Sequence, residues 1–515
     1  MIKNRLYKRP PNFGTIRDCT GFTKELTTEQ LVFSSSLALS SMIYSQLYQR
    51  AASQGPVKVG LIGTGHYGTA VLTQSMSIPL LHVAAIADNN LEAAKRAYAQ
   101  AGVAENEMVV CSSRAEALRA LPKKRIIVED PLLLMDLPLD VIAESTGAPE
   151  AGARHAYEAI CHGKHVAMIS KEPDSVVGPM LKHLADQAGV VYSQVDGDQH
   201  GLMIGWVGWL RSLGLEVLCA GKARDGEVAF KDDFSSARGV WNPNCETSAA
   251  HDTVNLAPED RRWLGFIPEG ESAKYLAERH RILQSMPSMR SATFDLCESV
   301  IAVNATGLLP DGPDMHDPVV RISEIPRVLC PRSEGGVLEK RGVIDVVIPL
   351  RGECDANMGG GVFAVIACSN DYSRQIVVEK GLWANPKQTA AVIFRPHHLC
   401  GVETSTTLLC AGLLGIPTGN DASYRPLYDM IVSTLRPRRA GEIINCEHDP
   451  SFKASLVPAV SLKSRGPLPA HLSTGRRLKQ DIPAGAALTQ DMLDIPADSF
   501  LFDLRKKQDE HFRLA

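Results

Sequence analysis

The feature that most constrains the fold is the stretch at residues 57–68, VKVGLIGTGHYG, an apolar run that leads directly into a glycine-rich turn. Gly63, Gly65 and Gly68 have the spacing G-x-G-x-x-G. In this pattern the first glycine permits a tight turn, the second lets the backbone approach a pyrophosphate, and the third allows close packing of helix on strand. The free N–H groups at the start of the following helix favour an anion. The stretch therefore predicts a dinucleotide site built from a strand, a turn and a helix.

The next apolar run, HVAAIAD, ends at Asp88, roughly 20 residues beyond the glycines, where a carboxylate can accept hydrogen bonds from ribose hydroxyls. The charge of Asp88 favours NAD, because it would repel a 2′-phosphate, whereas Lys95 and Arg96 just beyond it keep NADP open. The residues that we expect to contact the cofactor here are Gly63, Thr64, Gly65, His66, Tyr67, Gly68 and Asp88.

Strand-like and helix-like runs alternate up to about residue 200, which predicts a Rossmann-type, doubly wound parallel sheet. Ligands of such sheets bind beyond the carboxyl ends of the strands. That rule places Thr146 and Gly147 beside the nicotinamide, together with the polar end of the run HVAMISKEPD and that of VVYSQVDGDQ.

The composition is that of an ordinary globular protein, with 44% hydrophobic residues and a net charge of −4. This near-balance gives no electrostatic reason to expect nucleic acid or a membrane surface as a partner. The 12 cysteines are scattered without a C-x-x-C pair, so neither a zinc site nor a disulfide framework is indicated. Reduced thiols of this kind are typical of a cytoplasmic enzyme.

Residues 1–41 differ from the rest and are predicted to be a poorly ordered extension. Acidic residues and Pro10–Pro11 precede its apolar part, which does not fit a secretory signal. Residues 42–200 are predicted to form the cofactor-binding domain, 201–425 an α+β catalytic and dimerisation domain, and 426–515 a small β-rich domain. In the second domain we expect strands at GVIDVVIPL, GVFAVIACS, RQIVVEKG and AAVIFRPHHL, and the C-terminal LRKKQDEHFRLA is predicted to be a solvated helix.

Several motifs, in order, resemble a known family: GLIGTG, GKHVAMISKEPDSVVGPM, VDGDQ, AGK, VNATGL, PRSEGGVLEKRG, NDYSR, FRPHHLCGVE and QDIPAGAALTQDMLDI. The chain resembles the homoserine-dehydrogenase-like proteins with a C-terminal SAF domain, in particular the 1-deoxy-D-xylulose 5-phosphate reductoisomerase-like family, over about residues 42–500. The resemblance implies a homodimeric NAD(P)-dependent oxidoreductase.

The chain departs from the family pattern at three places. His66 and Tyr67 stand where the family carries Lys or Arg and then Phe, and residues 171–174 read KEPD where Val-Glu-Ala-Asp is usual. MRSATF stands before the VNATGL helix in place of Asp-Gly-Thr-Lys. The fold is expected to carry over despite these changes, whereas the substrate is not.

Hydride transfer to a carbonyl needs a proton donor or a cation near the developing alkoxide. Lys171, which follows a strand on the nicotinamide side, is the best-placed cation, and Glu172, Asp198 and Lys222 complete the predicted catalytic set. Glu172, Asp174 and Asp198 could bind a divalent ion or order substrate hydroxyls, although Asp174 also stands where it could cap a helix.

Lys222, Arg395, His397 and His398 are candidates for holding a phosphate or carboxylate of the substrate. The predicted substrate-binding residues are Asp174, Gln199, Arg395 and His398.

We therefore expect an oxidoreductase that uses NADP or NAD on a small polar anionic carbonyl or hydroxy compound. One specific version is a reductoisomerase acting on a sugar phosphate such as 1-deoxy-D-xylulose 5-phosphate, which would also need a divalent cation. The alternatives are a plain dehydrogenase of homoserine type, which needs no metal, and a non-catalytic nucleotide-binding protein.

Overall fold

The computed structural model describes residues 43–240, 253–286, 289, 293–445, 449 and 451–515. The predicted extension at residues 1–41 lies outside these residues. The chain divides into two units, Met1–Ser53, which contains helix α2 (Ile43–Ala51), and Gln54–Ala515. The elements below belong to the second unit.

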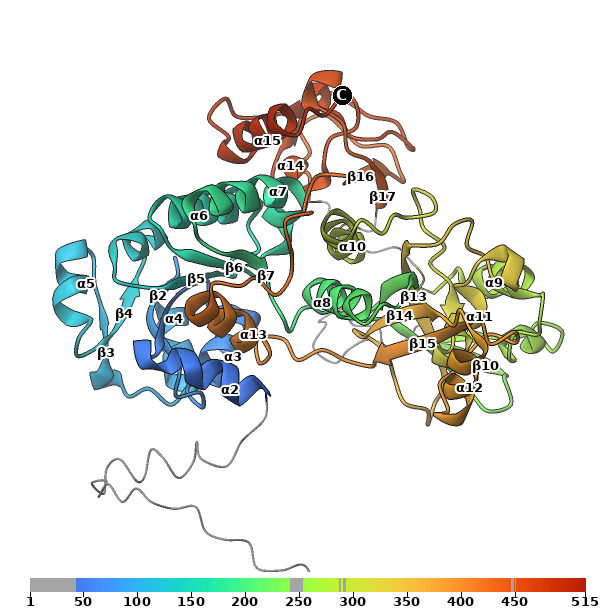
Figure 1. The fold of residues 1–515 in the computed structure, drawn as a ribbon. Coiled ribbons are helices and arrows are strands. Elements are labelled where there is room, and N and C mark those ends of the chain that lie inside the picture. Colours follow the sequence, from blue (N-terminus) through green and yellow to red (C-terminus); the bar gives the residue numbers. More distant parts are fainter. Residues whose placement is uncertain (1–42, 241–252, 287–288, 290–292, 446–448, 450) are drawn as a thin grey trace, which may run out of the picture. The chain divides into compact units, whose positions relative to one another are not determined.

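The first half of this unit forms a seven-stranded sheet with the order β3-β4-β2-β1-β5-β6-β7, in which every neighbouring pair is parallel (Figure 1). Its strands are nearly continuous apolar runs, as expected for a sheet covered on both faces. They are β1 (Val57–Ile62), β2 (Leu81–Ala87), β3 (Met108–Val110), β4 (Arg125–Val128), β5 (Val141–Glu144), β6 (His165–Met168) and β7 (Tyr192–Gln194). The predicted Rossmann-type α/β sheet is thereby confirmed.

Helices cover both faces of this sheet (Figure 1). One face carries α3 (His66–Ser75) and α4 (Leu91–Gln100), and the other carries α6 (Pro149–Cys161) and α7 (Lys171–Ala188). The strand order changes direction at β1, with β2 on one side and β5 on the other, so the carboxyl ends of the parallel neighbours β1 and β5 flank a crevice.

A mixed sheet follows, with the order β11-β10-β9-β13-β8-β14-β15 and β12 paired to β13. The central strand β13 is parallel to β8 and β9, whereas β14 is antiparallel to β8 and β15. The strands are β8 (Val217–Ala223), β9 (Glu227–Phe230), β10 (Ser236–Val240), β11 (Thr253–Asn255), β12 (Val319–Val320), β13 (Val343–Gly352), β14 (Val362–Ala367) and β15 (Ala390–Arg395). Helices α8 (Gln199–Ser212) and α10 (Thr293–Thr306) pack on each other, and α10 also contacts α7.

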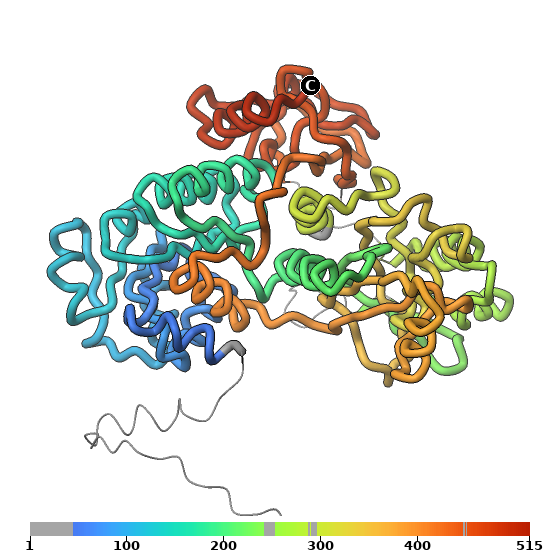
Figure 2. The backbone as a smooth tube through the Cα atoms, viewed as in Figure 1, coloured from blue at the N-terminus to red at the C-terminus, as the bar shows by residue number. Residues whose placement is uncertain are grey.

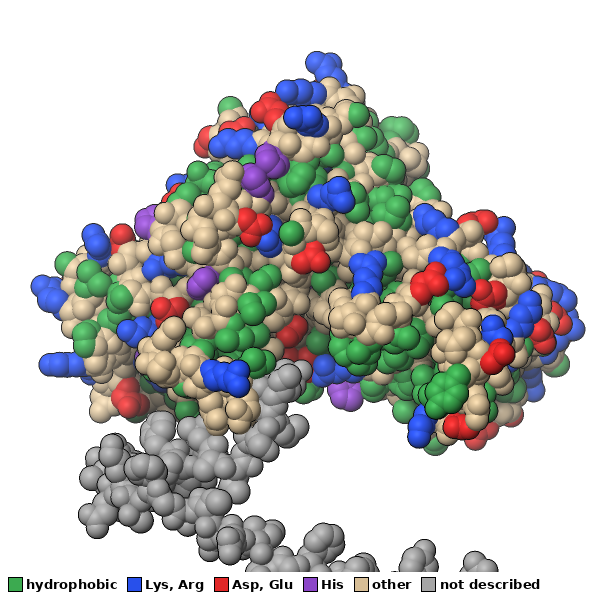
Figure 3. All heavy atoms as spheres, in the orientation of Figure 1, with side chains coloured by type: hydrophobic (Ala, Val, Ile, Leu, Met, Phe, Trp, Pro, Cys, Tyr) green, Lys and Arg blue, Asp and Glu red, His purple; other side chains and the backbone are tan. Residues whose placement is uncertain are grey.

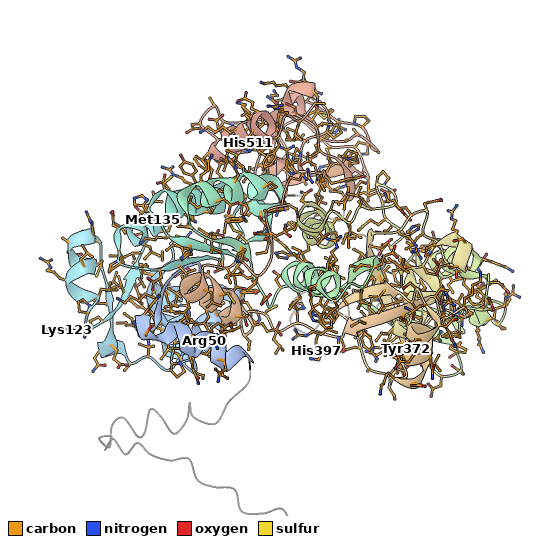
Figure 4. The ribbon with its side chains drawn as sticks, viewed as in Figure 1. Arg50, Lys123, Met135, Tyr372, His397 and His511 are labelled. Carbon is orange, nitrogen blue, oxygen red and sulfur yellow. The ribbon has the colours of Figure 1, made fainter. Side chains whose placement is uncertain are left out.

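One strand predicted in this region is wrong, because RQIVVEKG belongs to helix α12 (Asp371–Glu379). The side chain of Asn370 caps this helix by accepting a hydrogen bond from the backbone N–H of Ser373 at 2.9 Å. Within the helix only Val377 is buried, and Tyr372 is exposed on it (Figure 4). The apolar run IVV is short, and the preceding asparagine cap decides in favour of a helix.

After β15 the chain returns to the parallel sheet, as the tube in Figure 2 shows. Helix α13 (Thr404–Leu409) contacts β1, β2 and α3, and it continues as a π-helical turn (Cys410–Leu414). A Cβ atom at Gly401 would lie 2.6 Å from the Cβ of Ala70, so only glycine allows this approach to α3. Residues that follow the mixed sheet thereby lie against α3, the helix that begins at the glycine-rich turn.

The C-terminal region contains the antiparallel pair β16 (Tyr428–Thr434) and β17 (Phe452–Pro458), the short pair β18 (Arg477–Leu478) and β19 (Leu493–Asp494), and helices α14 (Ala470–Ser473) and α15 (Phe500–His511). The prediction of a solvated C-terminal helix is wrong. Helix α15 packs on α6 and α7 and buries Leu501, Leu504 and Arg505. The alternation of apolar and charged residues in FLFDLRKKQ is the pattern of one buried face.

No helix among the described residues is both long and apolar enough to cross a lipid bilayer. On the face drawn in Figure 3, acidic and basic side chains are interspersed.

Candidate active site

The glycine-rich turn has the geometry that its sequence predicts. Gly63 has a φ of +90°, and a Cβ atom there would lie 2.7 Å from the carbonyl oxygen of Ser145. A Cβ at Gly68 would lie 2.2 Å from the carbonyl oxygen of Gly63, so helix and turn are in direct contact. Gly65 has no atom within 4 Å of the position of a Cβ, and no side chain caps α3. This open position above an uncapped helix N-terminus fits a pyrophosphate.

Asp88 lies beside this turn. One of its oxygens accepts hydrogen bonds from both the N–H and the hydroxyl of Thr64, at 2.8 and 2.5 Å, and the other accepts one from the N–H of Asn90 at 2.8 Å. A pocket of about 590 Å³ opens from the turn along α3 and α4, and its walls include Thr64, Gly65, His66 and Arg96. The pocket thus places a guanidinium and an imidazole beside the turn.

The loop after β5 closes the other side of the crevice. The hydroxyl of Ser145 donates to the carbonyl oxygen of Gly63 at 2.9 Å. Thr146 donates through its hydroxyl to Glu144 at 2.6 Å, and Gly147 adopts a φ of +66° and donates its N–H to Ser170 at 2.8 Å. The carboxylate of Glu172 lies about 4 Å from where a Cβ of Gly147 would be.

Lys171 is the first residue of α7, and its ammonium group is bound to Glu298 of α10. The distance from Lys171 Nζ to Glu298 Oε1 is 2.7 Å, and Lys222 Nζ of β8 contacts the other carboxylate oxygen of Glu298. The side chain of Lys171 is 20% exposed, whereas those of Glu298 and Lys222 are 5% and 0% exposed. Lys171 is therefore the most solvent-accessible member of this cluster.

Asp198 and His200 lie next to this cluster. Asp198 caps α8 by accepting the N–H of Gln199 at 2.7 Å, and its Oδ1 lies 3.6 Å from Nδ1 of the fully buried His200. Burial alone would raise the pKa of Asp198, but His200, Lys171 and His398 outweigh burial and lower it. Conversely, burial would lower the pKa of His200, and Asp198 with Glu298 raises it.

Opposing shifts also act on Glu298. Burial would raise its pKa, but Lys171 and Lys222 outweigh burial, and the pKa is lowered. The three pKa shifts have one physical cause, because each buried group lies beside groups of opposite charge that favour its charged form.

The segment after β15 connects this cluster to the glycine-rich turn. Tyr67 Oη lies 2.9 Å from Thr404 Oγ1, and Thr404 donates to the carbonyl oxygen of Asp196 at 2.9 Å. Burial, followed by the charge of Asp198, raises the pKa of Tyr67 well above its usual value. His397, which lies in the same segment (Figure 4), precedes His398, whose Nδ1 lies 2.5 Å from the carbonyl oxygen of Gly360.

Of the predicted site residues, Lys171, Asp198 and Lys222 come together around Glu298. Arg395 forms an ion pair with Glu403, which occupies its guanidinium. Gln199 is buried and donates to the carbonyl oxygens of Ala223 and Gly361 at 2.9 and 3.2 Å, which gives it a structural role.

The interpretation of Asp174 as a helix cap is wrong, because α7 begins at Lys171 with Ser170 as its N-cap residue. Asp174 is fully buried and accepts hydrogen bonds from Tyr192 at 2.6 Å, Gln194 at 2.7 Å and Tyr424 at 3.1 Å. Burial raises its pKa despite these three donors. These bonds join α7 to β7 and to the segment that leads into β16.

Sequence reasoning did not assign a role to Glu298 or His200. In the sequence Glu298 is one of two acids, with Asp295, in the mainly apolar stretch FDLCESVIAVNAT, and His200 is the residue after VDGDQ. A charged residue on the buried face of a helix needs a partner, and that requirement is a usable signal.

Among the described residues, no group of three or more His, Cys, Asp or Glu side chains is arranged to hold a metal ion. Both oxygens of Glu298 accept a lysine instead.

Comparison with protein families gives one match, in which residues 266–404 fit the model described as "Oxidoreductase DRL, catalytic domain". The matched stretch contains Glu298 and the segment after β15. The match is confined to residues 266–404, and it makes this stretch similar to an oxidoreductase catalytic domain that follows the Rossmann-type sheet in the chain.

Similar solved structures include the 3-ketoreductase KijD10 from Actinomadura kijaniata with NADP and TDP-benzene, at 18% identity over 35% of this chain and 49% of that one, with a TM-score of 0.23. UDP-N-acetylglucosamine 3-dehydrogenase GnnA from Acidithiobacillus ferrooxidans matches at 17% identity over 34% of this chain and 48% of that one, also with a TM-score of 0.23. The chain spans about half the length of these structures. No curated protein matches the chain.

Proposed function

We propose that the protein transfers a hydride between a nicotinamide dinucleotide and a small, polar, anionic carbonyl or hydroxy compound. The observation that carries this proposal is the position of Lys171. It begins the helix after β6, on the strand-end side of the sheet that also holds the glycine-rich turn, and Glu298 binds its ammonium group at 2.7 Å.

The residues at the turn fit the dinucleotide. Gly65 leaves room for the pyrophosphate, the start of α3 offers N–H groups, and Asp88 can accept ribose hydroxyls in addition to its present donors. When bound, the cofactor supplies or accepts the hydride. The loop at Thr146 and Gly147 borders the nicotinamide half.

The chain's own residues supply the proton and the charge. Lys171 donates a proton to the substrate oxygen during reduction and accepts it during oxidation. Glu298 orients Lys171 and lies between two ammonium groups, so this three-residue cluster keeps one net positive charge. That charge favours an anionic substrate and stabilises a developing alkoxide.

We infer that NADP is preferred to NAD. The pocket along α3 and α4 contains the exposed Arg96, whose guanidinium suits a 2′-phosphate, while Asp88 is already engaged by Thr64 and Asn90. Replacing Arg96 by Ser is expected to raise the KM for NADPH about 10- to 100-fold and to leave that for NADH unchanged, since a charge-assisted hydrogen bond is worth about 1.5–3 kcal/mol. Equal effects on both cofactors would contradict this preference.

Two specific reactions fit this proposal. One is a reductoisomerase acting on a sugar phosphate such as 1-deoxy-D-xylulose 5-phosphate, and the other is a plain dehydrogenase of homoserine type. The arrangement of Glu298, with a lysine on each oxygen, favours the plain dehydrogenase, because a reductoisomerase of this kind needs a divalent cation. Turnover that survives EDTA supports the plain version, and turnover lost to EDTA and restored by Mg²⁺ or Mn²⁺ supports the other.

We also propose that residues 42–200, 201–425 and 426–515 act as a cofactor-binding, a catalytic and a SAF-like domain, that the protein is a homodimer, and that it works in the cytoplasm. Light scattering of the purified full chain tests the oligomeric state.

The central experiment follows NADPH oxidation with a panel of hydroxy-aldehydes, keto acids and sugar phosphates. Lys171→Met is expected to lower kcat about 10²- to 10⁴-fold, the usual contribution of a general acid. The exposed Lys380, which follows the last residue of α12, is the matched control, and Lys380→Met should leave kcat unchanged. Undiminished turnover in Lys171→Met would contradict the proposal and favour a nucleotide-binding role without catalysis.

A further inference from the structure

A second pocket, of about 670 Å³, lies between the parallel sheet and the C-terminal region. One wall is the loop after β4 with the first two turns of α6, and the other consists of residues 471–476 and 496–501. It shares no residue with the pocket at the glycine-rich turn.

The C-terminal wall is fixed to α6 by ordered contacts. Glu150 accepts hydrogen bonds from Arg476 at 2.8 Å, from the hydroxyl of Ser499 at 2.7 Å and from the N–H of Leu501 at 3.2 Å. Both oxygens of the Glu150 carboxylate are therefore engaged in these hydrogen bonds, and Arg476 offsets its charge.

The groups left available to a ligand are both donors and acceptors. His155 is 8% exposed, its Nδ1 faces the carboxylate of Glu144 as a donor at 3.2 Å, and its Nε2, left as an acceptor, has no hydrogen-bond partner among the described residues. The guanidinium of Arg154, also in the wall, forms no ion pair with a described residue. The first turn of α6 adds N–H groups that no side chain caps. Asp130 and Asp498, both exposed, stand at the same pocket and suit hydroxyl groups.

Two buried histidines of this pocket reach toward the active site. Nδ1 of His471 lies 3.0 Å from the hydroxyl of Ser175, one turn after Lys171 on α7, and 4.0 Å from Sγ of Cys297, the neighbour of Glu298 on α10. His155 contacts Glu144, which accepts the hydroxyl of Thr146. His471 thus links the pocket to the start of α7, and His155 links it through Glu144 to the loop at Thr146.

We propose that this pocket binds a small hydroxylated organic anion, such as a polyol phosphate, and that its occupancy is transmitted through His471 to the start of α7. The anionic group lies against Arg154 and the first N–H groups of α6, and the hydroxyls donate to Nε2 of His155 and to the carboxylates of Asp130 and Asp498. Binding at this position would be an effector site, distinct from the site of hydride transfer.

Isothermal titration of the full-length protein with glycerol phosphate tests the binding, with inorganic phosphate and glycerol as the two partial probes. Saturable binding of glycerol phosphate, weaker binding of phosphate and none of glycerol are expected. Arg154→Ala should raise the Kd about tenfold or more, whereas Arg436→Ala, at an exposed arginine outside the pocket, should not change it. Both variants change exposed residues and should melt at the wild-type temperature.

Three results would overturn the proposal: no saturable binding, an unchanged Kd in Arg154→Ala, or displacement of the probe by NADPH, which would make the pocket part of the cofactor site. Hydrogen exchange tests the transmission. Bound probe should protect amides at the start of α7 in the wild type and not in Arg154→Ala, and protection confined to the pocket loops would contradict it. Neither measurement requires turnover, so each can fail independently of the proposed hydride transfer.

Discussion

Glu298 illustrates at the scale of one residue how the site is held together. Its two oxygens separate two lysines that would otherwise repel each other in a buried space, and the energetic cost of burying its charge is offset by that pairing. Lys222, fully buried, serves this arrangement, while the partly exposed Lys171 remains available for chemistry.

The pair Asp198 and His200 makes stability depend on pH. The raised pKa of His200 means that its contribution to stability is fully present below its unfolded pKa of about 6.5 and is lost as the pH rises through the higher folded pKa. The lowered pKa of Asp198 adds a contribution that is present above its unfolded pKa and is lost only in acid.

Asp198→Asn should therefore cost more at pH 6 than at pH 9. We expect a loss of about 3 kcal/mol in the free energy of unfolding at pH 6, the scale of a broken buried ion pair, and a smaller loss at pH 9. Urea denaturation at both pH values measures this difference. The exposed Asp371→Asn is the control, and a loss that is equal at both pH values would show that His200 is not the partner.

At the scale of elements, the strand–turn–helix at residues 57–75 depends on three glycines with different tasks. Gly68→Ala would place a Cβ 2.2 Å from a carbonyl oxygen and should lower the melting temperature by several degrees, because overpacking costs about 1–3 kcal/mol. Gly65→Ala meets no atom within 4 Å and should fold like the wild type. Thermal melts followed by circular dichroism compare the two, and equal melting temperatures would show that the turn does not pack as described.

Elements were predictable where periodicity and local signals agreed. The parallel sheet follows from apolar runs that end in polar residues. Helix α10 ends at Thr306, and the next residue is Gly307, whose φ of +70° only glycine adopts readily. α12 was mistaken for a strand because IVV carries β-branched residues, while its asparagine cap lay outside the run.

The contacts between distant elements could not be predicted in this way. Tyr67 and Thr404 are 337 positions apart, and Lys171 and Glu298 are 127 apart, so no local pattern links them. Lys171 and Asp198 follow neighbouring parallel strands, so the rule that ligands bind beyond strand ends predicts that they lie close together. That rule does not predict that Glu298 of α10 joins them.

At the scale of the whole second unit, the C-terminal region is tied to the parallel sheet through α15. Gln508 donates to the carbonyl oxygen of Val176 at 2.9 Å and accepts the N–H of Met180 at 3.1 Å, both on α7. Arg505 is fully buried and donates to both oxygens of Asp429 at 2.6 and 2.7 Å. The helix that begins with Lys171 is thereby packed against the last helix of the chain.

Removing one member of this ion pair should destabilise the protein strongly. Arg505→Met leaves Asp429 buried without its partner, and we expect a loss of about 3–5 kcal/mol in the free energy of unfolding. Lys507→Met, at an exposed position on the same helix, should cost less than about 0.5 kcal/mol. Chemical denaturation measures both, and similar values for the two variants would mean that α15 does not dock through Arg505.

The most direct test of the account is a fluorescence titration of the full-length protein with NADPH, with Gly65→Glu as the matched variant. We expect saturable binding to the wild type and none to Gly65→Glu, because a carboxylate at that open position would occupy and repel the pyrophosphate. A wild-type protein that binds neither NADPH nor NADH, or a Gly65→Glu variant that binds as tightly as the wild type, would contradict the central claim that a nicotinamide dinucleotide lies on this turn.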